Sequence, residues 1–221
     1  MASDLQMRSE VSKPKLRGVL HQYAAVFSLG AGVVLVSLAP TPRALAAGAI
    51  FALSLVTLFG ISATYHRIIW SERARARMRR LDHASIFILI AGTYTPVAML
   101  GLPSETGTPL LFLAWGGALL GVALAVFWVG APKVLNALLA VAVGWTMVPY
   151  FGQVRASLQT VELVLLMVGG VAYTLGAVAY AAKRPNPIPG VFGYHEVFHA
   201  MTLVGAAAHL ATVVMIIRRV A

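Results

Sequence analysis

The stretch "HEVFHAMTLVGAAAHLATVVMII", residues 195–217, combines a membrane-spanning pattern with a cluster of histidines. Apart from Glu196 and the three histidines it carries no ionisable side chain, and it exceeds the roughly 20 apolar residues that a transmembrane helix needs. On a helix, His195 and His199 lie one turn apart on the same face. The pattern is literally HExxH, the signature of zinc proteases. The stretch therefore poses a choice between a zinc site, a protease and neither.

The composition of the whole chain indicates a polytopic membrane protein. Of 221 residues, 59% are hydrophobic and 11% charged, with mean hydropathy +0.83, whereas soluble domains carry roughly 25% charged residues. The net charge of +10 would suggest nucleic acid in a soluble protein, but here it indicates basic cytoplasmic loops and no nucleic-acid partner. Because the chain has no cysteine, a metal would have to be held by His, Asp, Glu or water.

The apolar runs predict an all-α bundle of seven transmembrane helices after a basic tail at 1–17. The tail is expected to be cytoplasmic, and the first apolar run is too long for a secretory signal. Turn-forming residues separate the runs. The predicted spans are 18–39, 44–68, 81–102, 109–130, 133–151, 160–182 and 191–217.

The distribution of Lys and Arg predicts the orientation. With seven spans, 13 of the 17 basic residues lie on the side of the N-terminus and 4 on the other. The positive-inside rule then places the N-terminus in the cytoplasm and the C-terminus outside. The expected location is the plasma membrane (the inner membrane of the cell), and the arginines of 73–80 are expected to meet anionic lipid headgroups. The sequence leaves the oligomeric state open.

Polar residues from three predicted spans converge at one depth. Given this orientation, Ser62, His66, Asp82, His195 and His199 all lie near the cytoplasmic ends of their spans. Ionisable residues inside a membrane are costly and are functional-site hypotheses by default. The sequence therefore predicts a polar site at this end of the bundle.

The residue types at this depth suit zinc. Three neutral imidazoles, from His66, His195 and His199, together with water, form the pattern of an open catalytic Zn²⁺ site. Asp82 would hydrogen-bond water at the metal or orient a ligand. In isolation, His66 is equally well explained as a residue at the membrane interface, and Asp82 as the N-cap of its helix.

The remaining histidines have weaker interpretations. His209 lies about 15 Å deeper than His199 at a rise of 1.5 Å per residue, so it is expected to be a buried, hydrogen-bonded histidine rather than a ligand. His21 lies near the cytoplasmic surface with no assignable partner, and the role of His83 stays open.

Three segments carry a family resemblance. "SATYHRI" (62–68), "RRLDHASIFILIAGTYTP" (79–96) and "GYHEVFHAMTLVGAAAHLATV" (193–213) resemble the signature segments of the hemolysin III family. That family is the bacterial branch of the progestin and adipoQ receptor family, which includes the adiponectin receptors. The resemblance implies seven helices, a cytoplasmic N-terminus and a zinc ion near the cytoplasmic face.

The resemblance also implies roles for individual residues. His66, His195 and His199 match the zinc ligands, Asp82 an acidic residue near the water at the zinc, and Ser62 the serine one turn before the first histidine. In the adiponectin receptors Gln replaces Glu after the first histidine of the pair. This difference weakens the protease interpretation, although local geometry alone does not exclude it.

Two classes of function follow. The first is a zinc-dependent hydrolase of lipid amide bonds, resembling alkaline ceramidases, with membrane lipids as partners and with Asp82 and Ser62 in catalytic roles. The second is a pore-forming, haemolysin-like protein or a membrane regulator in which the zinc is structural. The apolar character of the predicted spans 109–130, 133–151 and 160–182 speaks against a pore within one chain. A sensor read by a cytoplasmic partner is a weaker alternative.

Overall fold

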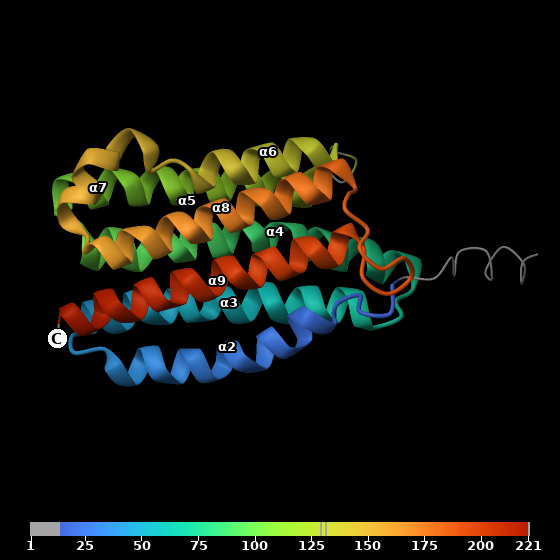
Figure 1. The fold of residues 1–221 in the computed structure, drawn as a ribbon, viewed down its shortest axis with the longest axis horizontal. Helices are drawn as coiled ribbons and strands as arrows, with labels where there is room; N and C mark the ends of the chain where they lie inside the picture. The colour runs from blue at the N-terminus through green and yellow to red at the C-terminus, as the bar shows by residue number, and fades with distance from the viewer. Residues whose placement is uncertain (1–13, 129, 131, 221) are drawn as a thin grey trace, which may run out of the picture.

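The computed structural model describes residues 14–128, 130 and 132–220, and most of the predicted tail at 1–17 lies outside them. Within the described residues the protein has seven helices long and apolar enough to cross a membrane, which confirms the predicted all-α, seven-span fold. They run along the long axis of the bundle (Figure 1). The spans comprise α2 (Val19–Leu38), α3 (Pro42–Arg67), α4 (Glu72–Pro96, continued by a π-helical turn at Val97–Gly101), α5 (Ser104–Phe127), α6 (Lys133–Gly144) with α7 (Phe151–Ser157), α8 (Thr160–Ala182) and α9 (Tyr194–Arg219).

Neighbouring helices in the sequence pack against each other, and α9 closes the bundle. The most extensive contacts join α8 to α9, α2 to α3, α3 to α4 and α4 to α5, and α2 also packs against α9. A buried apolar cluster that includes Leu35, Phe51, Val213 and Ile217 fills the space between α2, α3 and α9. This cluster thus holds together α3 and α9, the two helices that carry four of the five predicted site residues, with α2 packed against both.

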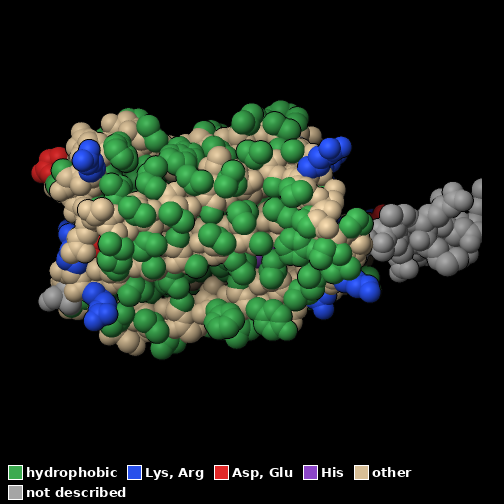
Figure 2. Space-filling view, viewed as in Figure 1, with side chains coloured by type: hydrophobic (Ala, Val, Ile, Leu, Met, Phe, Trp, Pro, Cys, Tyr) green, Lys and Arg blue, Asp and Glu red, His purple; other side chains and the backbone are tan. Residues whose placement is uncertain are grey.

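The surface of the bundle suits a lipid environment. In the view of Figure 2, hydrophobic side chains cover the flank and the Lys and Arg side chains gather at the two ends of the long axis. Many large apolar side chains are exposed, such as Phe27 at 77% and Phe112 at 76%. In water such a surface would be unfavourable, whereas in a bilayer it faces acyl chains.

The third span begins nine residues earlier than the predicted start at 81. The Ser71 hydroxyl accepts a hydrogen bond from the backbone N–H of Ala74, and the helix starts at Glu72. Apolarity alone does not reveal this extension, because its residues form helices well but most of them, Glu72 and five arginines, are charged. The helix therefore projects an arginine-rich segment beyond the apolar part of the span.

The fifth span is present over Val134–Ser157, but it ends later than the predicted 151 and is interrupted rather than one continuous helix. Helix α6 ends at Gly144, a short 3₁₀ turn covers Val148–Tyr150, and α7 continues to Ser157. Pro149 has no backbone N–H to continue the ladder. The Tyr94 hydroxyl of α4 hydrogen-bonds two backbone groups at the break, since it donates to the carbonyl of Gly144 (2.7 Å) and accepts from the N–H of Met147 (3.2 Å).

Candidate metal centre

Two helices bring three histidines together at one end of the bundle. His66 lies in the last turn of α3, and His195 and His199 lie in the first two turns of α9. One ring nitrogen from each falls within 4.8 Å of the other two. The Nε2 atoms of His66 and His195 are 3.2 Å apart, and the side chain of His66 is only 8% exposed. The three residues that the sequence proposed as ligands therefore share one site.

The separation of two of these nitrogens is close to that expected at a tetrahedral metal ion. Zn²⁺ binds imidazole nitrogen at about 2.0–2.1 Å, and tetrahedral angles then separate neighbouring ligand atoms by about 3.3–3.4 Å. The observed 3.2 Å between the Nε2 atoms of His66 and His195 is close to this value. Without a metal, two imidazole nitrogens at this distance can share one proton in a hydrogen bond.

Asp82 lies beside the three histidines but is not one of them. Its Oδ2 atom is 3.9 Å from Nε2 of His66, and its side chain is 13% exposed. It does not belong to the set whose ligand atoms fall within 4.8 Å of one another. The alternative interpretation of Asp82 as an N-cap is wrong, because α4 begins at Glu72 and is capped by Ser71. The carboxylate is thus available beside the histidine site.

Ser62 links Asp82 to a residue that the sequence left without a partner. The Ser62 hydroxyl is buried, interacts with the Asp82 side chain, and lies 2.8 Å from Nδ1 of His21. His21 comes from α2 and stacks on His199 with ring centroids 3.7 Å apart. The sequence assigned no partner to His21, and the structure shows two, Ser62 and His199. Its predicted depth matched the site, but only the packing of α2 against α9 shows the contact.

The start of α2 also approaches the site closely. Gly18 has φ +78°, a conformation that glycine adopts without strain. A Cβ atom at this position would lie 2.7 Å from Cβ of His66, so any larger residue would push α2 away. The backbone N–H groups of Lys15 and Leu16 donate to the carbonyls of Gly190 and Val191 in the loop before α9. These contacts hold the beginning of the described chain against the histidines.

The side chain of Glu196 is buried, and both of its carboxylate oxygens are engaged. It is 1% exposed, and its Oε2 atom accepts from the N–H of Gly193 (2.8 Å) at the start of α9. Its Oε1 atom pairs with Nε of Arg17. Both oxygens are therefore engaged in capping the helix and in an ion pair. The general base that an HExxH protease requires is thus not available in this arrangement.

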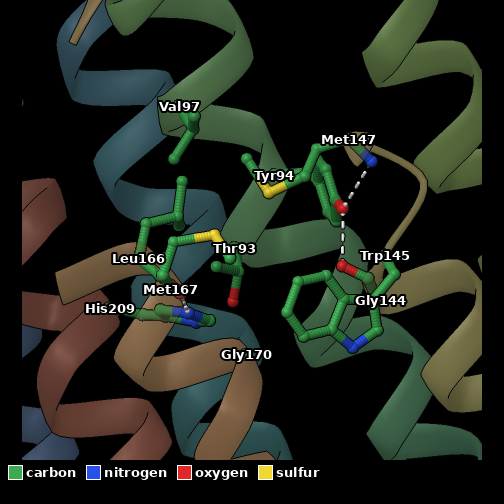
Figure 3. A pocket seen from close by; sticks show the side chains of 10 residues that line it. All are labelled: Thr93, Tyr94, Val97, Gly144, Trp145, Met147, Leu166, Met167, Gly170 and His209. Carbon is green, nitrogen blue, oxygen red and sulfur yellow. Dashed lines mark hydrogen bonds between the residues drawn. The ribbon is translucent and has the colours of Figure 1, made fainter. Parts of the chain in front are cut away.

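His83 and His209 are not members of the three-histidine set. Nε2 of His209 lies 3.1 Å from the carbonyl oxygen of Leu166, which confirms that His209 is a buried, hydrogen-bonded residue. Figure 3 shows His209 at a small cavity of about 30 Å³ that also borders Tyr94 and Trp145. This space has room for about two water molecules and belongs to the break in the fifth span rather than to the histidine site.

Most of the chain is similar to known proteins. Residues 9–210 match the family described as "Haemolysin-III related". The chain is 32% identical over 159 residues to "Hemolysin-3 homolog" of Bacillus subtilis (strain 168), covering 72% of this chain and 71% of that protein. It is 27% identical to "Hemolysin-3" of Bacillus cereus, covering 91% and 90%. It is also 28% identical to "Heptahelical transmembrane protein ADIPOR2" of Oryza sativa subsp. japonica, covering 74% and 79%. This protein therefore belongs to the haemolysin III-related family of multi-pass membrane proteins and is similar to an adiponectin-receptor-like heptahelical protein.

Proposed function

We propose that this protein is a zinc-dependent hydrolase that cleaves an amide bond in a membrane lipid. The single observation that carries the proposal is the convergence of His66, His195 and His199, with their ligand atoms within 4.8 Å, beside the carboxylate of Asp82. Three imidazoles leave a tetrahedral metal one open position, which is the arrangement of catalytic rather than structural zinc sites.

The residues present divide the chemistry between them. A Zn²⁺ ion bound here supplies Lewis acidity, which polarises a carbonyl group and makes water a stronger nucleophile near neutral pH. Asp82 accepts the proton of the attacking water and returns it to the leaving amine, because its carboxylate lies within 4 Å of the His66 nitrogen. Ser62 holds Asp82 in place through its hydroxyl. Glu196 takes no part, since both its oxygens are engaged.

The surroundings favour a lipid as substrate. The site lies at the end of a bundle whose flank is covered by apolar side chains (Figure 2). Helices α2 and α9 border the histidines, and the outer face of α2 exposes Tyr23, Val26 and Phe27 to the surrounding phase. This apolar surface favours a substrate that dissolves in the bilayer over a soluble peptide.

The first test separates metal binding from catalysis. Elemental analysis of purified wild type, His199→Ala and His209→Ala should give about one zinc per chain in the wild type and in His209→Ala, and none in His199→Ala. His209 is the matched control because it is an equally buried histidine of α9 that does not join the cluster. A folded wild type without metal contradicts the proposal.

The second test compares wild type with Asp82→Asn in detergent. It measures the turnover of a fluorescent ceramide, which has an amide bond, and of a diacylglycerol analogue, which has ester bonds instead. Asp82→Asn should keep its zinc and lose about 10²–10⁴-fold in kcat, as expected when a general acid–base group is removed. Equal rates in the two proteins would remove Asp82 from the mechanism. Zinc in the wild type with no turnover of either lipid would instead favour a structural metal that ties α3 to α9.

A further inference from the structure

His21 occupies a central place in the site although the three-histidine pattern does not include it. Its side chain is 2% exposed, and its ring lies parallel to that of His199, with centroids 3.7 Å apart and an interplanar angle of 12°. Phe59 of α3 covers it edge-on, with centroids 5.0 Å apart. The ring of His21 is thus fixed between α3 and α9.

The same ring also reaches the acidic side of the site. Nδ1 of His21 lies 2.8 Å from the Ser62 hydroxyl, and that hydroxyl interacts with the carboxylate of Asp82. One side chain of α2 therefore contacts a proposed metal ligand through its face and, through its edge, the Ser62 hydroxyl that interacts with Asp82. Among the described residues, His21 provides the direct link from α2 to both halves of the site.

The geometry argues against His21 as a fourth ligand. The lone pairs of an imidazole lie in the plane of its ring, so two rings stacked in parallel at 3.7 Å direct their lone pairs along separate planes. Such rings do not converge on one ion as the nearly perpendicular rings of His66 and His195 do, at 81°. His21 is also outside the set of residues whose ligand atoms fall within 4.8 Å of one another.

Packing alone does not account for a histidine here either. Nε2 of His21 is buried and has no hydrogen-bond partner among the described residues. A buried polar atom without a partner costs about 1–3 kcal/mol, and a phenylalanine would fill the same space without that cost. The histidine is thus better explained by its contacts with Ser62 and His199 than by the volume it occupies.

We infer that His21 is a positioning residue, which orients the ring of His199 by stacking and fixes the Ser62 hydroxyl against Asp82. This inference rests on the proposed metal site, but not on the proposed hydrolysis. Residues that orient metal ligands in this way typically change metal affinity 10–100-fold when they are replaced. His21 would act before any substrate binds, so its effect is measurable on the metal alone.

Two conservative variants separate the two contacts of His21. His21→Phe keeps a stacked ring and loses the hydrogen bond to Ser62, whereas His21→Asn keeps a polar group near the Nδ1 position and loses the ring. Zn²⁺ affinity is measured by chelator competition on full-length protein in detergent, with the absorption spectrum of bound Co²⁺ as a report on ligand geometry. His209→Asn is the control, because it removes a buried histidine outside the site.

His21→Asn should bind about one metal per chain with 10–100-fold weaker affinity and an altered Co²⁺ spectrum. His21→Phe should keep the Zn²⁺ affinity within about threefold of wild type. Its effect on thermal stability should not add to that of Ser62→Ala in a double-mutant cycle, because both substitutions remove the same hydrogen bond. His209→Asn should leave affinity and spectrum unchanged. Thermal unfolding of the metal-free variants identifies any that fail to fold.

Three results would overturn the inference. If folded His21→Asn has the Zn²⁺ affinity and the Co²⁺ spectrum of the wild type, the stacking of His21 on His199 has no effect on the metal site. Complete loss of metal, as in His199→Ala, would make His21 a ligand. A wild type without metal would remove the proposed site together with the inference. By contrast, metal binding with weakened affinity in His21→Asn, but no lipid turnover by the wild type, would contradict only the hydrolase proposal.

Discussion

At the scale of single residues, the neighbours in "HEVFH" have different tasks although they are adjacent in sequence. His195 and His199 face the bundle interior beside His66, whereas Glu196 lies about 100° further around the helix. That rotation directs its carboxylate to the start of α9, where it meets the N–H of Gly193 and the guanidinium of Arg17. The motif is therefore better understood as two metal ligands that flank a capping residue.

Glu196→Gln should lower stability and spare the metal. The variant weakens two hydrogen bonds of a buried carboxylate, one of them to a charged partner, so we expect a loss of about 1–3 kcal/mol in the free energy of unfolding. Zinc content should stay at about one per chain. Thermal unfolding and elemental analysis provide the two measurements, with Glu105→Gln, at an exposed glutamate of α5, as the control expected to match wild type. Full stability combined with loss of metal would assign Glu196 to the metal site instead.

At the scale of helices, close approach depends on where glycine lies. Gly121 of α5 packs directly against the ring of Phe87 of α4, which is 1% exposed, and a Cβ atom at Gly121 would overlap that ring. Gly116 lies on the same helix, yet a Cβ there would meet nothing within 4 Å. In a membrane, where helices associate largely through packing, small residues at such contacts let the backbones approach each other.

Gly121→Ala should therefore destabilise the bundle, whereas Gly116→Ala should not. Forcing extra volume into a packed contact costs about 1–3 kcal/mol. At Gly116 the better helix propensity of alanine should leave stability unchanged or raise it by up to about 1 kcal/mol. Thermal unfolding of both variants in the same detergent makes the comparison, and equal stability of the two would show that α4 and α5 do not pack as described.

At the scale of the whole molecule, the odd number of spans puts the two ends of the described chain at opposite ends of the bundle (Figure 1). The histidine site lies at the end where the described chain begins, together with the loops before α4 and α9. The basic residues are concentrated at that end, which is why we predict that it faces the cytoplasm. The orientation decides from which side the site exchanges metal and water.

Single cysteines can test the orientation, because the natural chain contains none. Arg77→Cys places a thiol on the exposed N-terminal extension of α4, and Arg155→Cys places one on exposed α7. In intact cells a membrane-impermeant maleimide should label Arg155→Cys and should label Arg77→Cys only after permeabilisation. The cysteine-free wild type is the blank. The reverse pattern would place the histidine site outside the cell.

The seven-helix architecture could be predicted without the structure, because in a bilayer the length and apolarity of a segment largely decide whether it spans. The sequence also indicated the depth of Ser62, His66, Asp82, His195 and His199, since depth follows from position along a span of known direction. The break in the fifth span was missed, although Gly144 and Pro149 were available signals. The early start of α4 was missed because hydropathy does not detect a polar helical extension.

Which of the residues at that depth contact each other depends on the packing of the whole bundle. Depth is one coordinate, whereas contact also depends on which helices are neighbours and how each is rotated, and side chains from the whole bundle determine both. The packing of α2 against α9 stacks His21 on His199, and the first residues before α2 bring Arg17 to Glu196. His21 is separated from His199 by most of the chain, so no local pattern could have paired them.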